Sequence, residues 1–181
     1  MLSSLLQPDL VLGGSILELS PDLWQRHNLK GLILDVDDTL VPLRQMDTPP
    51  ALLPWMNQAK QMGQIWLVSN NVNSHRIQRI ADLLEVPYLT SAAKPSRRKL
   101  QQALEGMVLP PQQVAMVGDR LFTDVLAGNR LGLFTILVEP IPAQGPRPGP
   151  SFLRWLEVSI SQVLGVNLSC SPPPPAPING R

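Results

Sequence analysis

Two acidic side chains follow an apolar run near the start of the chain. Asp35 and Asp37 come directly after Gly31-Leu32-Ile33-Leu34, and residues two apart on a strand share a face, so both carboxylates can point into one pocket. Carboxylate pairs suit Mg²⁺, which also neutralises a phosphate. One carboxylate can then attack phosphorus while the other carries protons. The pair indicates phosphate chemistry, because capping of a turn, the usual role of a lone Asp, does not explain such a cluster.

Three more polar clusters lie near the ends of later apolar runs. Ser69-Asn70 follows Val68, and Gly118-Asp119-Arg120 follows Val117, with Asp124 five residues after Asp119. Lys94-Pro95 precedes the helix expected between those two runs. Each cluster alone is common in turns, caps or solvated surfaces. Four of them in order, each next to a new element, favour a single shared site.

Alternating strands and helices would bring these clusters together. The run 31–36 is apolar throughout, which is typical of a central parallel strand covered on both faces. Further strands are expected at 64–69, 86–89, 114–117 and 133–138. Prolines at helix starts, Gly63 as a stop, a cap at Asn73 or Ser74 and helical spacing of apolar residues predict helices at 21–28, 51–62, 73–85, 95–107 and 123–131. The pattern predicts an α/β domain with a mostly parallel sheet, and in such sheets sites form at the carboxyl ends of strands.

The chain length of 181 residues fits one domain and a tail. Five prolines in the eleven residues from Pro140 predict a semi-rigid linker. We expect a domain at 1–140, a Pro-rich linker at 141–150, an amphipathic helix at 151–166 and a disordered Pro-rich tail at 167–181. The helix could lie on a membrane surface through Phe152 and Trp155 or dock on the domain, and its few Lys and Arg residues favour docking.

Charge and cysteine content exclude several classes of protein. A net charge of +1 argues against a general polyanion binder, so no nucleic-acid partner is expected. Cys170 is the only cysteine, so no disulfide framework or thiolate metal site is predicted. The first 25 residues lack Lys and Arg, and no apolar run reaches the roughly 20 residues that span a bilayer. These features predict a cytoplasmic protein.

The four clusters resemble the motifs of the haloacid-dehalogenase (HAD) phosphatases. The matching segments are Asp35-Val36-Asp37-Asp38-Thr39-Leu40, Val68-Ser69-Asn70, Lys94-Pro95, and Gly118-Asp119 through Thr123-Asp124. The resemblance implies a three-layer Rossmann-like fold and Mg²⁺ as cofactor. A phosphate receiver domain is a competing α/β interpretation, but its accepting Asp should end a middle strand, where this chain has Ser69.

The resemblance also implies a role for each matching residue. Asp35 would be the nucleophile, and Asp37 the general acid and then the base for the attacking water. Ser69 and the Asn70 amide would hold phosphate oxygens, while Lys94 would stabilise their charge. Mg²⁺ would be bound by Asp35, Asp37 through its carbonyl, and Asp119, with support from Asp124. Asp38 is expected to serve a local turn.

The spacings between the motifs predict an open active site with no cap domain to enclose the substrate. Thr39 to Ser69 and Asn70 to Lys94 leave room for about one helix each, so no cap domain is expected. A capless subclass IIIA branch, the YqeG-like proteins, is similar in Pro8-Asp9-Leu10, in the stretch 31–42, and in Leu126-Ala127-Gly128-Asn129-Arg130-Leu131-Gly132 with the following Thr135-Ile136-Leu137-Val138. The resemblance covers about residues 5 to 142, and the branch includes phosphatidylglycerophosphate phosphatases. This implies an anionic phospholipid substrate and peripheral contact with the inner membrane face. Hydrolysis of soluble or protein-bound phosphate esters is the alternative, and a non-catalytic binding module a third. Arg97, Arg98 and Lys99 beside Lys94 could bind an anion or face solvent.

Overall fold

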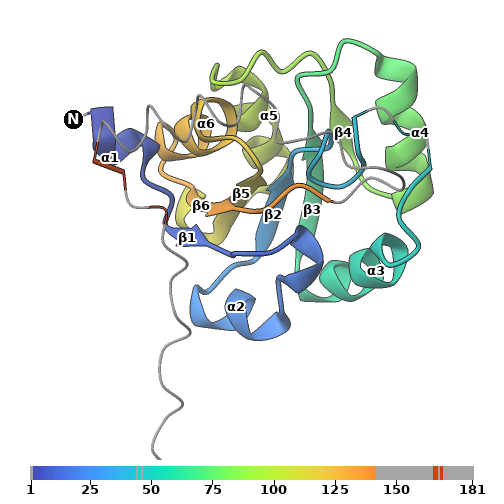
Figure 1. Ribbon diagram of the computed structural model, residues 1–181, viewed down its shortest axis with the longest axis horizontal. Helices are drawn as coiled ribbons and strands as arrows, with labels where there is room; N and C mark the ends of the chain where they lie inside the picture. Colours follow the sequence, from blue (N-terminus) through green and yellow to red (C-terminus); the bar gives the residue numbers. More distant parts are fainter. Residues whose placement is uncertain (1, 44, 46, 142–164, 167, 169–181) are drawn as a thin grey trace, which may run out of the picture.

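Six parallel strands form the centre of the protein (Figure 1). The computed structural model describes residues 2–43, 45, 47–141, 165–166 and 168. The strand order is β1-β6-β5-β2-β3-β4. The strands are β1 (Leu10–Val11), β2 (Gly31–Leu34), β3 (Gln64–Val68), β4 (Tyr88–Leu89), β5 (Val114–Gly118) and β6 (Phe134–Leu137).

Six α-helices and three further helical segments accompany these strands in the described part of the chain. The α-helices are α1 (Leu2–Leu6), α2 (Pro21–Arg26), α3 (Leu52–Met62), α4 (Ser74–Leu84), α5 (Arg98–Met107) and α6 (Leu126–Asn129). Single 3₁₀ turns span Ile16–Glu18 and Pro111–Gln113, and a π-helical turn, η3, spans Leu121–Val125. This architecture confirms the expected α/β class, with no cap domain inserted in the described residues.

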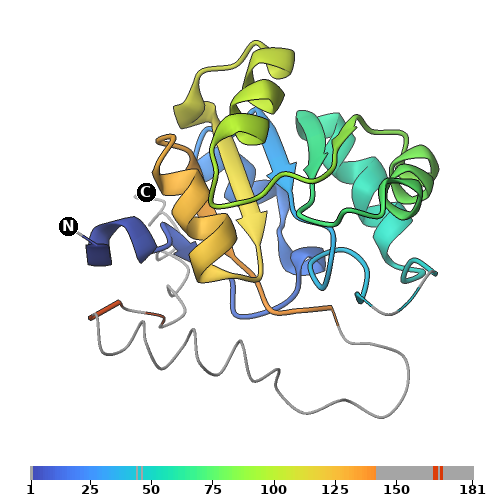
Figure 2. The same cartoon turned by 90° about the horizontal axis from the view of Figure 1, so that it is seen from above.

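The sheet has a helical layer on each face (Figure 2). Alternate side chains of β2 point to opposite faces, so Leu32 and Leu34 join one apolar cluster and Ile33 the other. The first cluster contains residues of α2, α3 and α4, and the second contains residues of α5 and α6. Burial on both faces explains why β2 is apolar at every position.

Most element boundaries agree with the sequence-based expectations within a few residues, and the start of α5 differs for an identifiable reason. Helix α5 begins at Arg98 rather than Pro95, because the preceding residues form a turn in which Ser96 N–H donates to Ala93. Gly63 ends α3, as expected, and its backbone is extended. Glycine is needed there for space, since a Cβ would lie 2.2 Å from the Lys30 carbonyl oxygen.

The N-terminal segment adds an edge strand that the sequence analysis did not predict. Strand β1 pairs in parallel with β6, with Leu10 opposite Ile136. Just before it, Asp9 Oδ2 accepts hydrogen bonds from the backbone N–H and the hydroxyl of Thr135, at 2.7 and 2.9 Å. Two strand residues carry too little periodicity to be recognised in sequence.

Beyond β6 the chain keeps contact with the domain where it is described. Ile141 is buried and its N–H donates to the Asp38 carbonyl at 2.8 Å. Val166 is also buried, and Leu168 packs against Leu121, Val125 and Leu137. The expected linker at 141–150, helix at 151–166 and tail at 167–181 fall almost wholly outside the described residues. No helix in the described ranges has the length and apolar character to cross a bilayer.

Candidate active site

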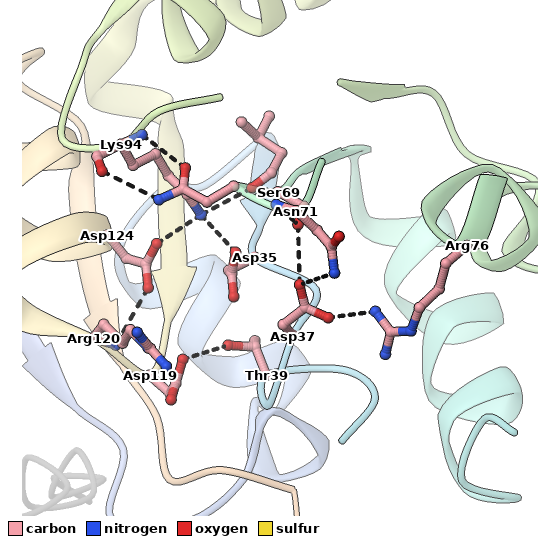
Figure 3. A network of polar contacts seen from close by, with 12 residues as sticks. Asp35, Asp37, Thr39, Ser69, Asn71, Arg76, Lys94, Asp119, Arg120 and Asp124 are labelled. Atoms are coloured by element: carbon pink, nitrogen blue, oxygen red, sulfur yellow. Dashed lines mark hydrogen bonds and ion pairs between the residues drawn. The ribbon is translucent and has the colours of Figure 1, made fainter. Parts of the chain in front are cut away.

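The polar residues that the sequence analysis singled out meet at the carboxyl edge of the sheet (Figure 3). Asp35 follows β2 directly, and its N–H continues the ladder by donating to Val117 at 3.0 Å. Ser69 follows β3, and Asp119 follows β5. All strands are parallel, so these three ends lie at one edge.

The ammonium group of Lys94 lies at the centre of the cluster. Its Nζ is 2.6 Å from Asp35 Oδ1 and 2.7 Å from Asp124 Oδ1, and it donates to the Val68 carbonyl at 2.9 Å. Lys94 is only 5% exposed. Its own backbone is held by the Asn70 side chain, which accepts from Lys94 N–H at 2.7 Å and donates to Lys94 O at 3.1 Å. Asn70 therefore fixes where Lys94 enters the site.

Three buried carboxylates form a group with the composition of a metal site. Asp35, Asp119 and Asp124 each offer one oxygen within 4.8 Å of the others. Asp124 comes from the π-helical turn η3, and its Oδ2 accepts from Arg120 N–H at 3.2 Å. Asp119 Oδ1 accepts from the Thr39 hydroxyl at 3.4 Å. Both oxygens of Asp124 thus face cationic or N–H groups, whereas in the described residues no group donates to Asp35 Oδ2 or Asp119 Oδ2.

Burial changes the acidity of the cluster. It raises the pKa of Asp35 to about 7, an effect that Lys94 opposes and Asp124 reinforces. Burial likewise raises the pKa of Asp119 to about 8, with repulsion from Asp35 and Asp124 adding to it. Although burial acts to lower the pKa of Lys94, the carboxylates of Asp124 and Asp35 raise it above its ordinary value. The site therefore keeps its ammonium charged while its carboxylates are costly to ionise without more positive charge.

Asp37 lies beside this group with its carboxylate directed elsewhere. Its Oδ1 pairs with Arg76 Nη1 of α4. Its Oδ2 accepts from Asn71 Nδ2 at 3.0 Å and from the Ser69 hydroxyl at 3.4 Å. The side chain of Asp37 is consequently outside the three-carboxylate group, and the metal role that the sequence analysis gave this residue rests on its backbone carbonyl.

An open pocket of about 360 Å³ covers the site. It is lined by polar groups from the motifs and by two apolar side chains: Asp35, Asp37, Asn70, Asn71, Lys94, Arg120, Thr123, Leu43 and Val72. Asp35 and Asp37 therefore face one pocket, as their spacing predicts. Ser69 is fully buried and is not among the lining residues.

Some residues within or next to the motifs line the pocket, and others lie away from it. Asp38 serves a turn, as expected, because it adopts left-handed backbone and its Oδ1 accepts from Leu43 N–H at 3.0 Å. The side chains of Arg97, Arg98 and Lys99 are not among those lining the pocket, and Arg97 donates to the Arg130 carbonyl. The basic groups that face the pocket are Lys94 and Arg120.

Five polar residues of the site lie outside the sequence-based set. Thr39, Arg120 and Thr123 stand inside the recognised motifs, so their adjacency to acidic residues is a usable signal. Asn71 follows Ser69-Asn70 directly. Arg76 carries no such signal, because a basic residue in an amphipathic helix is ordinarily solvated, and only the packing of α4 buries it.

Comparison with known sequences identifies related proteins. Residues 91–140 match the HAD-hydrolase-like family. The chain is 36% identical over 128 residues to the "Probable phosphatase YqeG" of Bacillus subtilis, an alignment that covers 70% of this chain and 74% of that protein. It is 28% identical over 137 residues to "Phosphatidylglycerophosphate phosphatase 1, chloroplastic" of Chlamydomonas reinhardtii, which covers 71% of this chain and 51% of that protein. This chain thus spans about half the length of the algal relative.

Solved structures share the fold at low sequence identity. An uncharacterised protein from Listeria monocytogenes superposes with a TM-score of 0.52 at 17% identity, over 76% of this chain and all of that one. A "putative HAD superfamily (subfamily III A) hydrolase" from Legionella pneumophila gives a TM-score of 0.51 at 17% identity, over 67% of this chain and 74% of that one.

Proposed function

Because this chain belongs to the HAD-type phosphatases, we propose that it is a Mg²⁺-dependent phosphomonoesterase that forms an aspartyl-phosphate on Asp35 and converts phosphatidylglycerophosphate to phosphatidylglycerol. The observation that carries the proposal is the pocket in which Asp35 lies against Lys94 and which Asp37 also lines. A non-catalytic module would have no need for a buried nucleophile, a charged lysine and a second carboxylate at one opening.

The oxygen ligands that the carboxylate group offers suit a hard divalent cation. The raised pKa values of Asp35 and Asp119 follow from burial and from mutual repulsion, and a dication would relieve both. Asp35, Asp119 and the Asp37 carbonyl would hold it, while Asp124 holds Lys94 and the Arg120 amide. Bound Mg²⁺ would neutralise charge on the phosphate oxygens.

The proposed reaction has two steps. An Asp35 carboxylate oxygen attacks phosphorus, the P–O ester bond breaks, and the leaving oxygen takes a proton from Asp37. A water molecule then attacks the phosphorus of the aspartyl-phosphate, passes a proton to Asp37, and releases inorganic phosphate with the Asp35 carboxylate restored. Lys94 Nζ lies 2.6 Å from Asp35 Oδ1, where it can stabilise the phosphoryl oxygens.

Ser69 and the Asn70 amide are the proposed phosphate holders. The Ser69 hydroxyl oxygen accepts from Asn71 N–H at 3.0 Å, but the hydroxyl donates to Asp37 at 3.4 Å, which is long for such a donor, so its proton is weakly held and can turn to a phosphate oxygen. The Asn70 side chain is occupied by Lys94, which leaves the backbone amide for this role. Arg120 at the pocket wall adds a second positive charge toward an anionic head group.

Two exposed apolar side chains at the pocket support a lipid substrate. Val72 is 83% exposed and Leu43 is 47% exposed, and both line the opening. Exposed apolar groups around a charged, uncapped pocket fit a molecule whose phosphate enters the site while its acyl chains stay in an interface. We propose the membrane surface that faces the cytoplasm as the place of action.

The test compares phosphatidylglycerophosphate in mixed micelles with soluble phosphate esters, in the presence of Mg²⁺. We expect at least tenfold higher kcat/KM for the lipid, and an acid-stable phosphoenzyme that is absent from Asp35→Asn. Asp82→Asn, on the exposed face of α4, is the control and should behave like the wild type. Full activity of Asp35→Asn would overturn the mechanism.

Variants of the apolar residues test the substrate separately from the chemistry. Leu43→Ser with Val72→Ser should lower turnover of the lipid and leave soluble esters nearly unchanged. Leu83→Ser with Val108→Ser removes comparably exposed apolar groups away from the pocket and serves as the matched control. Equal turnover of lipid and soluble esters by the wild type would favour a phosphatase for soluble or protein-bound esters.

A further inference from the structure

A buried arginine outside the four motifs contacts the proposed general acid. Arg76, in the first turn of α4, is only 6% exposed. Arginine is rarely buried unless its charge is paired, because desolvation of the guanidinium is costly. Its partner here is Asp37, which Arg76 reaches through Nη1. The pairing is therefore the main electrostatic reason that the guanidinium can be buried.

The same guanidinium also binds the backbone that follows Asp37. Nη2 donates to the Pro42 carbonyl at 3.2 Å and to the Gln45 carbonyl at 3.3 Å. Arg76 thus ties the side chain of Asp37 and two later points of its loop to one helix. The helix is itself anchored at this end, because Asn73 Oδ1 accepts from Arg76 N–H at 3.1 Å.

The two oxygens of Asp37 are held on different sides. Arg76 occupies Oδ1, while Oδ2 accepts from Asn71 Nδ2 at 3.0 Å and from the more distant Ser69 hydroxyl. A guanidinium can donate but cannot accept, so the oxygen that it contacts has an acceptor role only. The Asn71 amide group likewise only donates, whereas the Ser69 hydroxyl can also accept, so Oδ2 is the oxygen that can carry the proton given to the substrate.

We infer that Arg76 is a positioning residue for proton transfer, which orients Asp37 so that Oδ2 faces the leaving oxygen of the substrate. The inference rests on the proposed function, since it assigns to Asp37 the donation of the proton to the leaving group. Arg76 itself does not contact the pocket, whose lining comprises other residues. Its effect passes through Asp37.

Two substrates whose leaving groups differ in basicity can show whether Arg76 positions the proton donor or only supports the fold. An alkoxide needs a proton as the ester bond breaks, whereas p-nitrophenolate leaves readily without one. Arg76→Met should lower kcat/KM by about 30- to 100-fold for glycerol phosphate, and by about threefold or less for p-nitrophenyl phosphate. The ratio of the two values does not depend on the fraction of protein that is folded.

Matched variants make the experiment specific. Arg79→Met removes an exposed arginine from the same helix and should leave the ratio unchanged. Arg76→Lys keeps the charge but loses the fork that contacts Asp37 and the loop together, so an intermediate ratio is expected. Should Arg76→Met fail to fold, Arg76→Lys alone gives the comparison. In an Asp37→Asn background, Arg76→Met should not change the ratio further, because the proton donor is already absent.

The outcomes distinguish this inference from the proposed function. Equal losses for the two substrates in the Arg76 variants would assign to Arg76 a purely structural role and overturn the inference, while the phosphatase proposal stands. A further change of the ratio in the Asp37→Asn background would also overturn it. Lack of turnover of any phosphate ester by the wild type would instead overturn the proposed function, and the inference with it.

Discussion

At the scale of single residues, Lys94 connects most of the candidate site. Its ammonium group contacts Asp35, Asp124 and the Val68 carbonyl, all within 2.9 Å. A buried charge of this kind is costly to leave without its partner, since the remaining carboxylates lose their compensation in a medium of low dielectric constant. Lys94 therefore contributes to folding as well as to the proposed chemistry.

Replacing Lys94 should affect stability and activity together. We expect Lys94→Met to lower the free energy of unfolding by about 3–5 kcal/mol, as for other buried ion pairs that lose one member, and to abolish hydrolysis. Urea denaturation at pH 7 measures the first effect and a phosphate-release assay the second. Lys60→Met is the control, because Lys60 pairs with Glu85 at the surface and should cost less than about 1 kcal/mol. Similar losses in the two variants would contradict this interpretation.

At the scale of elements, the end of β5 and the turn η3 place two acids of the site. Gly118 is the last residue of β5, and Asp119 follows it. A Cβ on Gly118 would lie 2.3 Å from Asp124 Oδ2, so the strand end and η3 approach too closely for any side chain. The π-helical geometry of η3 directs Asp124 back toward Lys94. Glycine is required here because any side chain would displace Asp124, which contacts Lys94.

Substituting this glycine should disturb the site more than the fold. Gly118→Ala is expected to displace Asp124 and lower kcat/KM by about 100-fold, the order of loss that a 1 Å misplacement can cause. Gly106→Ala introduces a comparable clash with Trp66, where the nearest atom would lie at 2.4 Å, away from the pocket. That control should lose thermal stability and keep the kcat of its folded fraction. Wild-type kinetics in Gly118→Ala would argue against a role for Asp124.

At the scale of the whole molecule, the site is an acidic cluster buried at the edge of the sheet. The pKa values of Asp35 and Asp119 lie at about 7 and about 8 in the folded protein, compared with about 4 in an unfolded chain. Between pH 4 and pH 8, approximately, the metal-free folded state therefore binds more protons than the unfolded state. Its stability should fall as the pH rises through this window.

A bound cation should reverse this trend. We expect the midpoint of thermal unfolding in EDTA to decrease from pH 5 to pH 8, and the increase produced by Mg²⁺ to grow over the same range, because ionised carboxylates bind the metal. Asp119→Asn should flatten the pH dependence and reduce the increase. If Mg²⁺ raises the midpoint of thermal unfolding by the same amount at every pH in this range, or by the same amount in Asp119→Asn as in the wild type, these carboxylates do not bind the ion.

Sequence alone was sufficient for the class of fold and for the four motif clusters. The uniformly apolar β2 run predicts a strand covered on both faces, and an acid directly after a parallel strand must lie at the carboxyl edge. Both conclusions depend only on which residues follow one another along the chain. The roles of Asp35, Asp37, Ser69, Asn70, Lys94, Asp119 and Asp124, and Mg²⁺ as cofactor, remain predictions.

Tertiary structure decided which groups touch. Thr39 reaches Asp119 across 80 positions of the chain, Arg76 reaches Asp37 across 39, and Asp9 reaches Thr135 across 126. Such contacts leave no periodic or compositional signal, because they depend on where helices pack and not on neighbouring residues. The sequence therefore determines that Asp35 and Asp37 stand together at a strand end, while only the packing of α4 decides that Asp37 is paired with a buried arginine.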